Sequence, residues 1–325
     1  MGDRVSAESR TCPTGQVPSV SIDLSAVVVA VTREEPRVLA LRTGARPALP
    51  LGPLETEHRT LDTGLRSWVE RQTDQRLNYV EQLYTFGDLD RQEDGVRALS
   101  VAYMALVREA HSTGEAPAAW PGWYGFFPWE DWREGRPAVL DSIHAALETW
   151  ARAASNRRTA NLRRQRLRLA FSDEGAAPGP CSGSSWNEER VLERYELLYE
   201  AGLVAEAGGD DGGLALGRAM AFDHRRILAT AIGRLRGKIK YRPVVFELMP
   251  PAFTLLQLQR AVEALSGMRL HKQNFRRLVE TQGLVEETGE TVSDTGGRPA
   301  RLVRFRPEVL LERPAPGVRP PAARR

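Results

Sequence analysis

Hydrophobic positions in the first part of the chain follow strand patterns, with one helix pattern among them. Apolar runs over residues 21–31 and 37–42 lie on either side of a polar Arg-Glu-Glu-Pro turn, which predicts two strands. Within 61–72 the apolar residues recur at spacings of three and four, which predicts a helix; they are Leu61, Leu65, Trp68 and Val69. Residues 80–86 and 98–107 are typical of further strands. We therefore expect a sheet with a helix between its strands.

The middle of the chain has a different pattern. Residues 120–132 (WPGWYGFFPWEDW) hold four tryptophans, and their prolines exclude a regular helix or a central strand. We favour a hydrophobic packing loop over a platform on which bases stack. Helices are predicted over 138–171 (one or two) and 188–200, the first with apolar positions at Ile143, Leu147, Trp150, Leu162, Leu167 and Leu169. The Gly/Pro/Ser-rich residues 172–185 predict a flexible linker.

A helix over residues 221–236, capped by Asp223, leads into the C-terminal part of the chain. It is followed by a second helix, in which Thr254 and Gln257 have the spacing of a capping box and Gly267 supplies a left-handed stop. Its expected buried stripe is Leu255, Leu258, Val262 and Leu265.

A third helix, over residues 271–282, follows after a short turn and ends at Gly283. It places Phe275, Leu278 and Val279 inward and leaves polar and basic side chains outside. Two strands, over 284–288 and 298–306, come next, and the second alternates arginines with apolar residues. Helix, short turn, helix and hairpin is the order of a winged helix. The alternative is an α+β oligomerisation module with a basic face.

Charge is distributed unevenly along the chain. Residues 234–325 carry 18 Lys/Arg against 9 Asp/Glu, whereas residues 1–233 carry 27 against 33. A concentrated positive field raises affinity for phosphate, so we expect the C-terminal part to face a polyanion. A second basic group precedes the linker, and there we favour a solvated face over contact with phosphate: Arg157, Arg158, Arg163, Arg164, Arg166 and Arg168.

Composition narrows the class of protein. A chain of 325 residues is expected to form about two domains. The longest apolar stretch, residues 26–31, is too short to span a bilayer, and the N-terminus has no secretory signal pattern, so a cytoplasmic location is expected. Cys12 and Cys181 have no metal-binding or disulfide spacing, and we expect no metal site. The aperiodic residues 1–19 and the tail 313–325 are expected to be disordered.

One segment resembles a motif that carries catalytic residues in other proteins. Residues 52–74 (GPLETEHRTLDTGLRSWVERQTD) resemble the Nudix box, a glycine loop followed by a helix with an arginine and three glutamates. Gly52 takes the first position, Arg66 takes that of the arginine, and Glu70 takes that of one glutamate.

The departures from the Nudix pattern exclude ordinary catalysis. Ser67 and Arg71 stand where the other two helical glutamates would lie, His58 replaces the loop glutamate, and Thr73 replaces the last glycine. In active members the glutamates share a helix face and hold the divalent cations that polarise a diphosphate. A guanidinium at a ligand position repels Mg²⁺, so we expect no enzyme activity, no catalytic residues and no required cofactor.

The flanking sequence resembles Nudix-related transcriptional regulators of the NrtR family. The similarity lies in YVEQLYTFGDLD (79–90) and ALSVAYMALV (98–107), and in AFDH, LRGKIKY, FTLLQLQ, NFRR and RPARLVRFRP of the C-terminal half. It covers about residues 22–108 and 220–307. The resemblance implies an α+β chain: a Nudix-like α/β/α sandwich with a helical insertion, followed by a winged helix-turn-helix domain.

The resemblance also implies partners and sites. A nucleotide effector would bind the Nudix-like domain, with Arg42, Arg66, Glu70, Phe86 and Asp88 as lining residues. Double-stranded operator DNA would bind the C-terminal domain of a homodimer, through Lys272, Gln273, Asn274, Arg276, Arg277, Arg298, Arg301 and Arg304. We place the effector-sensing domain at 20–236, its insertion at about 112–216, and the DNA-binding domain at 237–312.

Residues 125–141 (GFFPWEDWREGRPAVLD), inside the insertion, resemble the NadQ branch of this family. That similarity implies a repressor of NAD biosynthesis genes with an adenine nucleotide such as ATP, or an ADP-ribose-type or NAD-related ligand, as effector. The alternatives are an active Nudix hydrolase of a nucleoside diphosphate derivative with an accessory basic domain, and an RNA-binding or scaffold protein. The missing glutamates favour the repressor over the hydrolase.

Overall fold

The computed structural model describes residues 20–42, 44–87, 97–110, 114–171, 186–208, 214, 216–293, 299–312 and 316–318. The predicted tail 1–19, the linker 172–185 and most of the tail 313–325 lie outside these ranges. Among the described residues, no helix combines the length and the apolar character needed to cross a membrane.

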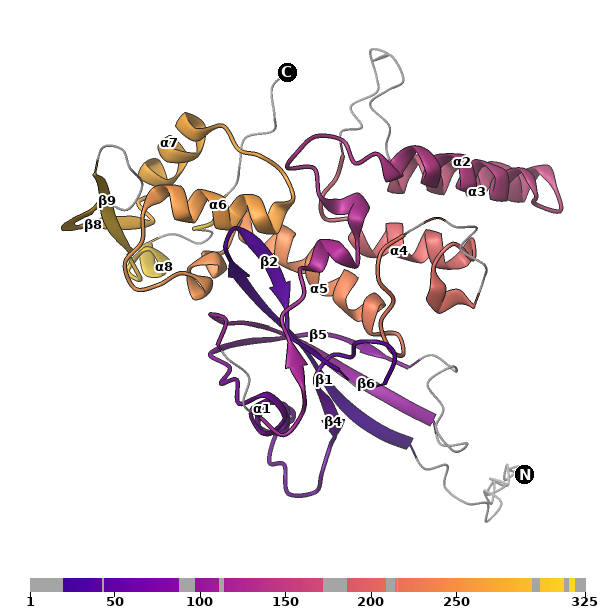
Figure 1. The fold of residues 1–325 in the computed structure, drawn as a ribbon, viewed down its shortest axis with the longest axis horizontal. Coiled ribbons are helices and arrows are strands. Elements are labelled where there is room, and N and C mark those ends of the chain that lie inside the picture. Colours follow the sequence, from indigo (N-terminus) through magenta and orange to yellow (C-terminus); the bar gives the residue numbers. More distant parts are fainter. Residues whose placement is uncertain are drawn as a thin grey trace, which may run out of the picture.

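A mixed five-stranded sheet forms the centre of the N-terminal part (Figure 1). Its strands are β1 (Val20–Thr32), β2 (Glu35–Val38), β4 (Leu51–Pro53), β5 (Tyr79–Phe86) and β6 (Arg97–Leu106). The order is β2-β1-β6-β5, with β4 also paired to β1. β1 and β6 are parallel, and the other pairs are antiparallel.

The strand predicted over 37–42 is divided in two. β2 ends at Val38, and Ala40–Leu41 form β3, which pairs with β7 (Ala118–Ala119) in a separate ribbon. The turn before β2 consists of Arg33 and Glu34, both with left-handed backbone (φ 53° and 63°). Two successive left-handed residues are the geometry of the tightest hairpin turns, whose twist matches that of the strands.

Helix α1 (Leu61–Thr73) covers one face of the sheet, as predicted. Its buried Leu65 and Val69 pack with Leu24, Ala26, Val28 and Ala30 of β1. Thr60 caps the helix in a reciprocal arrangement with Thr63. The intervening Val27 and Val29 of β1 point into a second core cluster on the opposite face, so β1 is buried on both sides.

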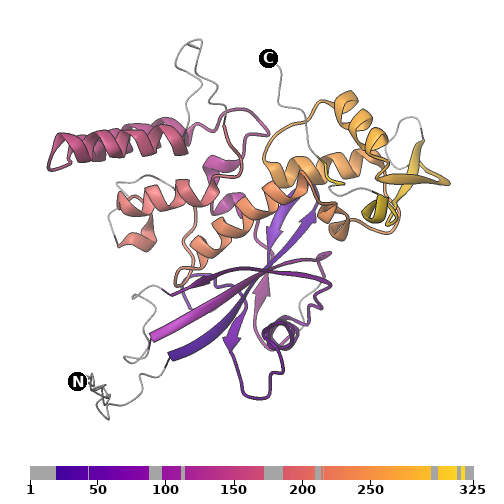
Figure 2. The same cartoon turned by 180° about the vertical axis from the view of Figure 1, so that it is seen from behind.

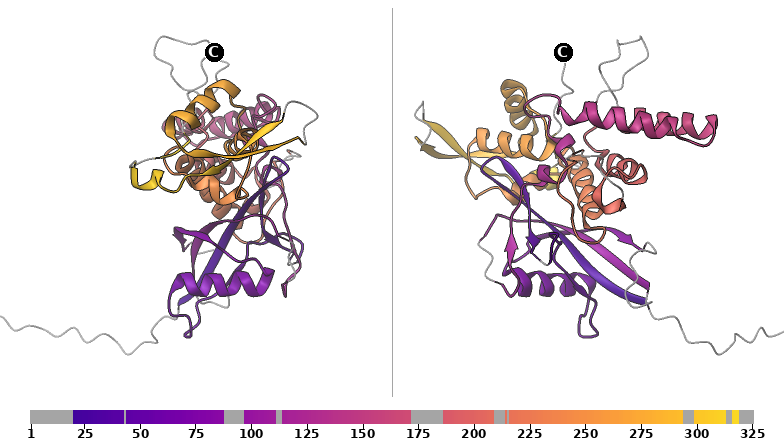
Figure 3. Two further views of the ribbon diagram at one scale, coloured as in Figure 1. Left: turned by 90° about the vertical axis from the view of Figure 1, so that its left-hand side faces the viewer. Right: turned by 45° about the vertical axis from the view of Figure 1, so that its right-hand side comes forward.

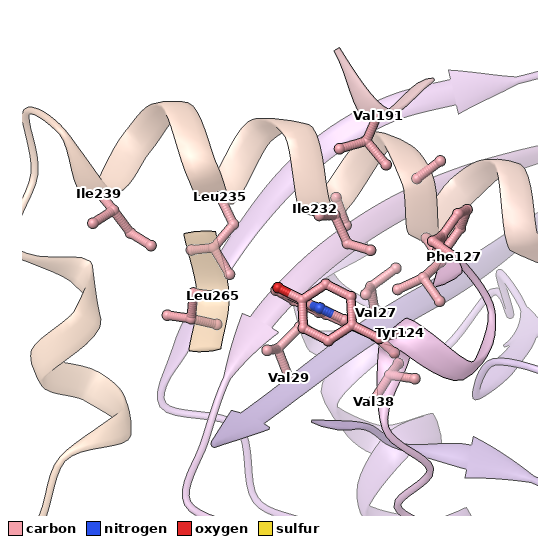
Figure 4. Close-up of a cluster of buried hydrophobic side chains, with 14 of the residues drawn as sticks. Val27, Val29, Val38, Tyr124, Phe127, Val191, Ile232, Leu235, Ile239 and Leu265 are labelled. Atoms are coloured by element: carbon pink, nitrogen blue, oxygen red, sulfur yellow. The ribbon is translucent and has the colours of Figure 1, made fainter. Parts of the chain in front are cut away.

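The opposite face is covered by residues 120–132, here called the aromatic segment, and by helix α5 (His224–Ile239), as Figures 1 and 2 show. The aromatic segment contains two 3₁₀ turns, η2 (Trp123–Gly125) and η3 (Pro128–Glu130). Trp123, Phe126, Phe127 and Trp129 are completely buried, which confirms the packing loop and rules out base stacking by these four rings. Figure 4 shows Tyr124 between Val27 and Val29 of the sheet and Ile232 and Leu235 of α5, with Phe127 to one side of it.

The insertion also supplies helices α2 (Val139–Arg152), α3 (Arg157–Ala170) and α4 (Val191–Glu200), and a short 3₁₀ turn η4 (Ala205–Ala207). α2 and α3 form a hairpin that extends away from the rest of the molecule (Figure 1). Of the apolar positions named for these helices, Leu162 and Leu169 are 56% and 51% exposed. α3 buries a narrow stripe that consists of Leu167 and Ala170.

The C-terminal part contains η5 (Val244–Leu248), α6 (Leu255–Ser266), α7 (Lys272–Gln282), β8 (Val285–Val292), β9 (Ala300–Phe305) and α8 (Val309–Glu312). Of these, α6, α7, β8 and β9 follow the predicted order, whereas η5 and α8 were not predicted. The Thr254–Gln257 capping box is present, and Gly267 and Gly283 end their helices with φ of 75° and 60°. By contrast, α5 begins at His224, later than predicted, and Asp223 makes no capping hydrogen bond through its side chain.

The two halves share one core. α6 packs against β1, β2 and α5, and residues of the sheet, the insertion and the winged helix belong to one buried cluster. Figure 3 shows the sheet between α1 below and the C-terminal elements above. The boundary that we placed between residues 236 and 237 falls within α5, which runs without interruption through it.

Candidate effector and DNA-binding sites

Trp68 of α1 packs against the glycine loop, the segment that begins at Gly52 and leads into this helix. Gly52 pairs with Leu24 of β1, and a Cβ atom at Gly52 would overlap the Trp68 ring. The indole Nε1 donates a hydrogen bond of 2.8 Å to the carbonyl oxygen of Pro53. Glycine is therefore required here because the indole lies directly against the loop backbone.

Ser67, Glu70 and Arg71 occupy the positions of the three helical glutamates of the Nudix pattern. The Arg71 guanidinium lies 3.7 Å from the centroid of the Trp68 ring, a cation–π contact. The Glu70 carboxylate accepts a 3.0 Å hydrogen bond from Arg76, and Ser67 is exposed. His58 accepts a hydrogen bond from the Glu55 backbone through Nδ1, within the loop.

This arrangement does not fit a divalent cation. Its one carboxylate is already paired with Arg76, and the next position carries the Arg71 cation. Across the described residues, no cluster of three or more His, Cys, Asp or Glu side chains has the arrangement of a metal site. A hard divalent cation needs several oxygen ligands, which α1 does not offer.

Arg66 fixes the segment that follows α1. Its Nε donates to Asp62 at 2.8 Å, and its two terminal nitrogens donate to the carbonyl oxygens of Leu77 and Asn78. The side chain therefore joins the helix to the start of β5, and this role is structural whatever else binds it.

The other predicted effector residues are dispersed. Arg42 is exposed at the end of β3, and its backbone N–H donates to Pro117. Phe86 is 5% exposed and packs in the core cluster on the sheet face opposite α1. Asp88 lies outside the described residues. Arg66 and Glu70 share α1, but the structure does not bring Phe86 to their side of the sheet.

A polar group beside the β3–β7 ribbon is not among the predicted site residues. Arg37 Nη1 donates to the carbonyl oxygen of Trp120 at 3.1 Å, and Arg37 Nε lies 3.7 Å from a carboxylate oxygen of Glu109. Neither Arg37 Nε nor Glu109 Oε2 has a hydrogen-bond partner among the described residues, although both atoms are buried. Nothing in the local sequence signals this pair, because the two residues are brought together by the sheet.

Helix α7 presents the predicted basic and polar face. Lys272, Gln273, Arg276 and Arg277 are exposed, and Asn274 is partly buried. Arg276 pairs with Glu280 on the next turn, at 3.0 Å. Within the described part of the chain, Lys272 and Arg277 form no ion pair. They are therefore the cations of α7 that are available to a phosphate or a base edge.

The β8–β9 hairpin, here called the wing, has less free positive charge than the arginines of β9 alone indicate. Arg301 of β9 pairs with Glu287 of β8, and Arg304 pairs with Glu286, both at 2.6 Å. Both pairs are exposed, so each contributes at most about 1 kcal/mol to stability and is readily exchanged for another anion. Arg298 lies outside the described residues.

The arginines of α3 divide into two groups. Arg163 stacks on Trp150, Arg164 pairs with Glu148, and Arg166 pairs with Glu200. Arg157, Arg158 and Arg168 are exposed, and the described residues offer them no acidic partner. The interpretation of this group as a solvated face fits three of the six arginines.

A family model matches the C-terminal part of the chain. Residues 245–305 match the NrtR DNA-binding winged helix domain. The chain is 44% identical, over 91 residues, to a protein of Acinetobacter baylyi named ADPR responsive transcriptional repressor NtrR. That match spans 28% of this chain and 36% of the relative, about a third of the relative's length.

Two solved structures have the same overall fold. Shewanella oneidensis NrtR, crystallised with a 27mer DNA, superposes with a TM-score of 0.55 at 18% identity, covering 93% of this chain and 99% of that one. A MutT/nudix family protein from Enterococcus faecalis gives 0.52 at 14% identity, covering 91% and 90%. The fold therefore joins a Nudix-like domain to an NrtR-type winged helix domain, the latter at residues 245–305.

Proposed function

We propose that this chain is a transcriptional repressor that binds double-stranded operator DNA through its winged helix and senses a nucleotide with its Nudix-like domain. The observation that carries the proposal is the match of residues 245–305 to the NrtR winged helix. That range contains α6, α7, β8 and β9, and α7 exposes Lys272 and Arg277 without ion-pair partners in the described residues. A basic, outward-facing second helix is what reads a major groove in this motif.

The DNA-binding residues that we propose are those of α7 and the wing. Lys272, Gln273, Asn274, Arg276 and Arg277 would contact bases and nearby phosphates. Arg298, Arg301 and Arg304 would hold the backbone. We propose a homodimer, because a two-fold dimer matches the symmetry of a palindromic operator.

For the effector, the name of the Acinetobacter relative, ADPR responsive, supports an ADP-ribose-type ligand. The resemblance of residues 125–141 to the NadQ branch favours an adenine nucleotide such as ATP, and NAD biosynthesis genes as targets. Both ligands carry a phosphate-linked adenosine. Arg42, Arg66, Glu70, Phe86 and Asp88 remain our predicted contacts, although Phe86 would have to be reached from the far side of the sheet.

We propose that this domain binds its ligand without hydrolysing it. Supporting this, Trp68 and Arg71 cover the junction between the glycine loop and α1, and Glu70 is paired with Arg76. Hydrolysis of a diphosphate needs a cation cluster to stabilise the developing charge. No observation favours the alternative of an active hydrolase.

The test is binding-site selection with the full chain on a pool of random duplexes, followed by titration of the recovered duplex and a scrambled one. We expect recovery of a two-fold symmetric site. Arg277→Ala should weaken binding to it, whereas the exposed Arg152→Ala on α2 should not. ADP-ribose, ATP and NAD are then added separately, and at least one should change operator affinity. Failure to recover any preferred sequence would refute the proposal.

A further inference from the structure

Residues 130–134 (Glu-Asp-Trp-Arg-Glu), here called the bridging segment, contact two turns that are far apart in sequence. One is the β1–β2 turn at Arg33 and Glu34, which belongs to the central sheet. The other is the α6–α7 turn, residues 267–271, which sets where the proposed recognition helix begins. The segment comes from the insertion and lies outside both the central sheet and the winged helix that it joins.

At the sheet end, Arg133 is the contact. Its Nη1 donates to the carbonyl oxygen of Glu34 at 2.7 Å, and its Nη2 donates to the Glu35 carboxylate at 2.9 Å. The remaining donors bind the Asp131 carboxylate in a two-pronged arrangement, with both distances 2.8 Å. The Arg133 side chain is only 9% exposed. A planar guanidinium held by this many acceptors has one orientation, which makes it suited to fixing a turn.

At the other end, the bridging segment holds the α6–α7 turn through its backbone. Trp132 N–H donates to the Gly267 carbonyl oxygen at 2.7 Å. Gly267 has a left-handed backbone, and a Cβ atom there would overlap the carbonyl oxygen of Glu130. This close approach is possible with glycine alone, and it leaves the turn no room to move toward the segment.

Side chains also fix the α6–α7 turn. Glu134 accepts a 2.6 Å hydrogen bond from Arg269, which also binds Glu263 of α6 at 3.1 Å. The Glu263 carboxylate accepts the Leu270 N–H at 3.0 Å, two residues before α7 begins. The position of Lys272, the first residue of α7, therefore depends on contacts that reach back to residues 130–134.

The bridging segment is itself immobilised. The buried Glu130 carboxylate binds Arg194 of α4 and Arg236 of α5, with shortest distances of 2.6 Å. Arg236 also donates to the Leu265 carbonyl oxygen of α6 at 3.0 Å. A segment fixed in this way transmits a shift at one end to the other instead of absorbing it.

The sheet end leads directly to the proposed nucleotide site. β1 runs from the β1–β2 turn back to Leu24, which pairs with Gly52 of the glycine loop and packs near Leu65 of α1. A ligand that displaces the glycine loop or α1 would therefore displace β1, whose far end carries the Glu34 carbonyl that Arg133 binds. The contacts form a continuous physical network between the two sites.

We propose that Arg133 is a positioning residue that couples the β1–β2 turn to the start of α7, so that ligand binding at the glycine loop alters the presentation of the recognition helix. The coupling role rests on the proposed function. The link between the β1–β2 turn and the α6–α7 turn does not depend on the proposed function, because its contacts are present without a ligand.

The test is hydrogen–deuterium exchange on the full chain, with and without ADP-ribose or ATP, for the wild type and three variants. Arg133→Met removes the hydrogen bonds from the bridging segment to the β1–β2 turn. Glu35→Gln removes the negative charge of one acceptor at the half-exposed sheet end, and Arg136→Met is the matched control. Arg136 pairs with Asp141 at the N-terminus of α2. Without ligand, we expect amides 268–274 to exchange roughly fivefold faster in Arg133→Met, less so in Glu35→Gln, and unchanged in the control.

With ligand, wild-type protection should change both at residues 50–73 and at 266–282. In Arg133→Met the first change should persist and the second should be lost. Persistence of the change at 266–282 in that variant would overturn the coupling role. Equal exchange of amides 268–274 in Arg133→Met and Arg136→Met would overturn the link itself. If no ligand alters residues 50–73 in the wild type, the nucleotide site is refuted and the ligand-free comparison still decides the link.

Discussion

The Glu130 carboxylate accepts a 2.6 Å hydrogen bond from Arg236 in a site from which solvent is excluded, and Arg194 binds the same carboxylate from another helix. Removing one member of a buried ionic group leaves the other charges without compensation. We predict that Glu130→Ala lowers the free energy of unfolding by about 3–5 kcal/mol, measured by urea denaturation.

Glu134→Ala provides the control for that substitution. Its carboxylate is 84% exposed and pairs with Arg269, so its loss should cost less than about 1 kcal/mol. Equal destabilisation by the two substitutions would show that the buried group does not stabilise the fold more than a surface pair does.

A second prediction concerns chemistry at α1. Incubation of the protein with ADP-ribose and Mg²⁺ or Mn²⁺ should give no metal-dependent release of AMP, because Glu70 is the only carboxylate left at the helical ligand positions of the Nudix pattern, it is paired with Arg76, and the next position carries the Arg71 cation. Product analysis by chromatography checks this. Turnover that requires the metal and disappears in Glu70→Gln would contradict the proposal that the domain binds its ligand without hydrolysing it.

A third prediction follows from Glu263. Burial opposes ionisation of this carboxyl, but hydrogen bonds from the Leu270 N–H and from Gln259 and Arg269 outweigh it and hold its pKa below the ordinary value of 4.5. A lowered pKa in the folded state adds stability that is present above pH 4.5 and is lost as the pH falls through the folded value.

Thermal denaturation of the wild type and Glu263→Gln across pH 3–7 tests this, with the pH range chosen to span the ordinary value of 4.5. At neutral pH the wild type should be more stable by about 1.5–3 kcal/mol, the usual worth of hydrogen bonds to a charged group. The difference should shrink below pH 4.5. A difference that stays constant down to pH 3 would mean that the carboxylate charge does not stabilise the α6–α7 turn.

These cases show what a sequence can and cannot predict here. The Thr254–Gln257 capping box and the stop at Gly267 were predictable because each depends on backbone groups within one turn. The Glu130–Arg236 pair was not, because its partners are 106 residues apart and meet through packing. The pairing of Arg301 with Glu287 depends on hairpin register, which the alternation of residues does not fix. The winged-helix fold of residues 245–305 was predictable, but the ion pairs across the wing and the separation of Phe86 from Arg66 and Glu70 were not.

A fourth prediction concerns the acidic strand of the wing. Glu287 holds Arg301 at 2.6 Å and would lie near DNA phosphates if the wing does. Glu287→Gln should therefore raise affinity for scrambled duplexes by removing a repulsive charge and releasing Arg301, with a smaller change for the operator. Fluorescence anisotropy at several salt concentrations measures both. Unchanged affinity for scrambled DNA would place the wing away from the backbone.

The last prediction separates base contacts from phosphate contacts. Arg277 is exposed on α7 and has no ion-pair partner in the described residues, so it is free to contact a base edge, whereas Arg301 lies on the wing beside Glu287. Losing a base contact costs roughly 1–3 kcal/mol at one operator position, and losing a phosphate contact weakens all sequences and lowers the salt slope by about one. Arg277→Ala should thus reduce operator affinity more than scrambled-DNA affinity, and Arg301→Ala should reduce both with a shallower salt dependence. If neither substitution acts but Arg157→Ala or Arg158→Ala on α3 does, the DNA surface lies on the α2–α3 hairpin and the winged-helix assignment of function is wrong.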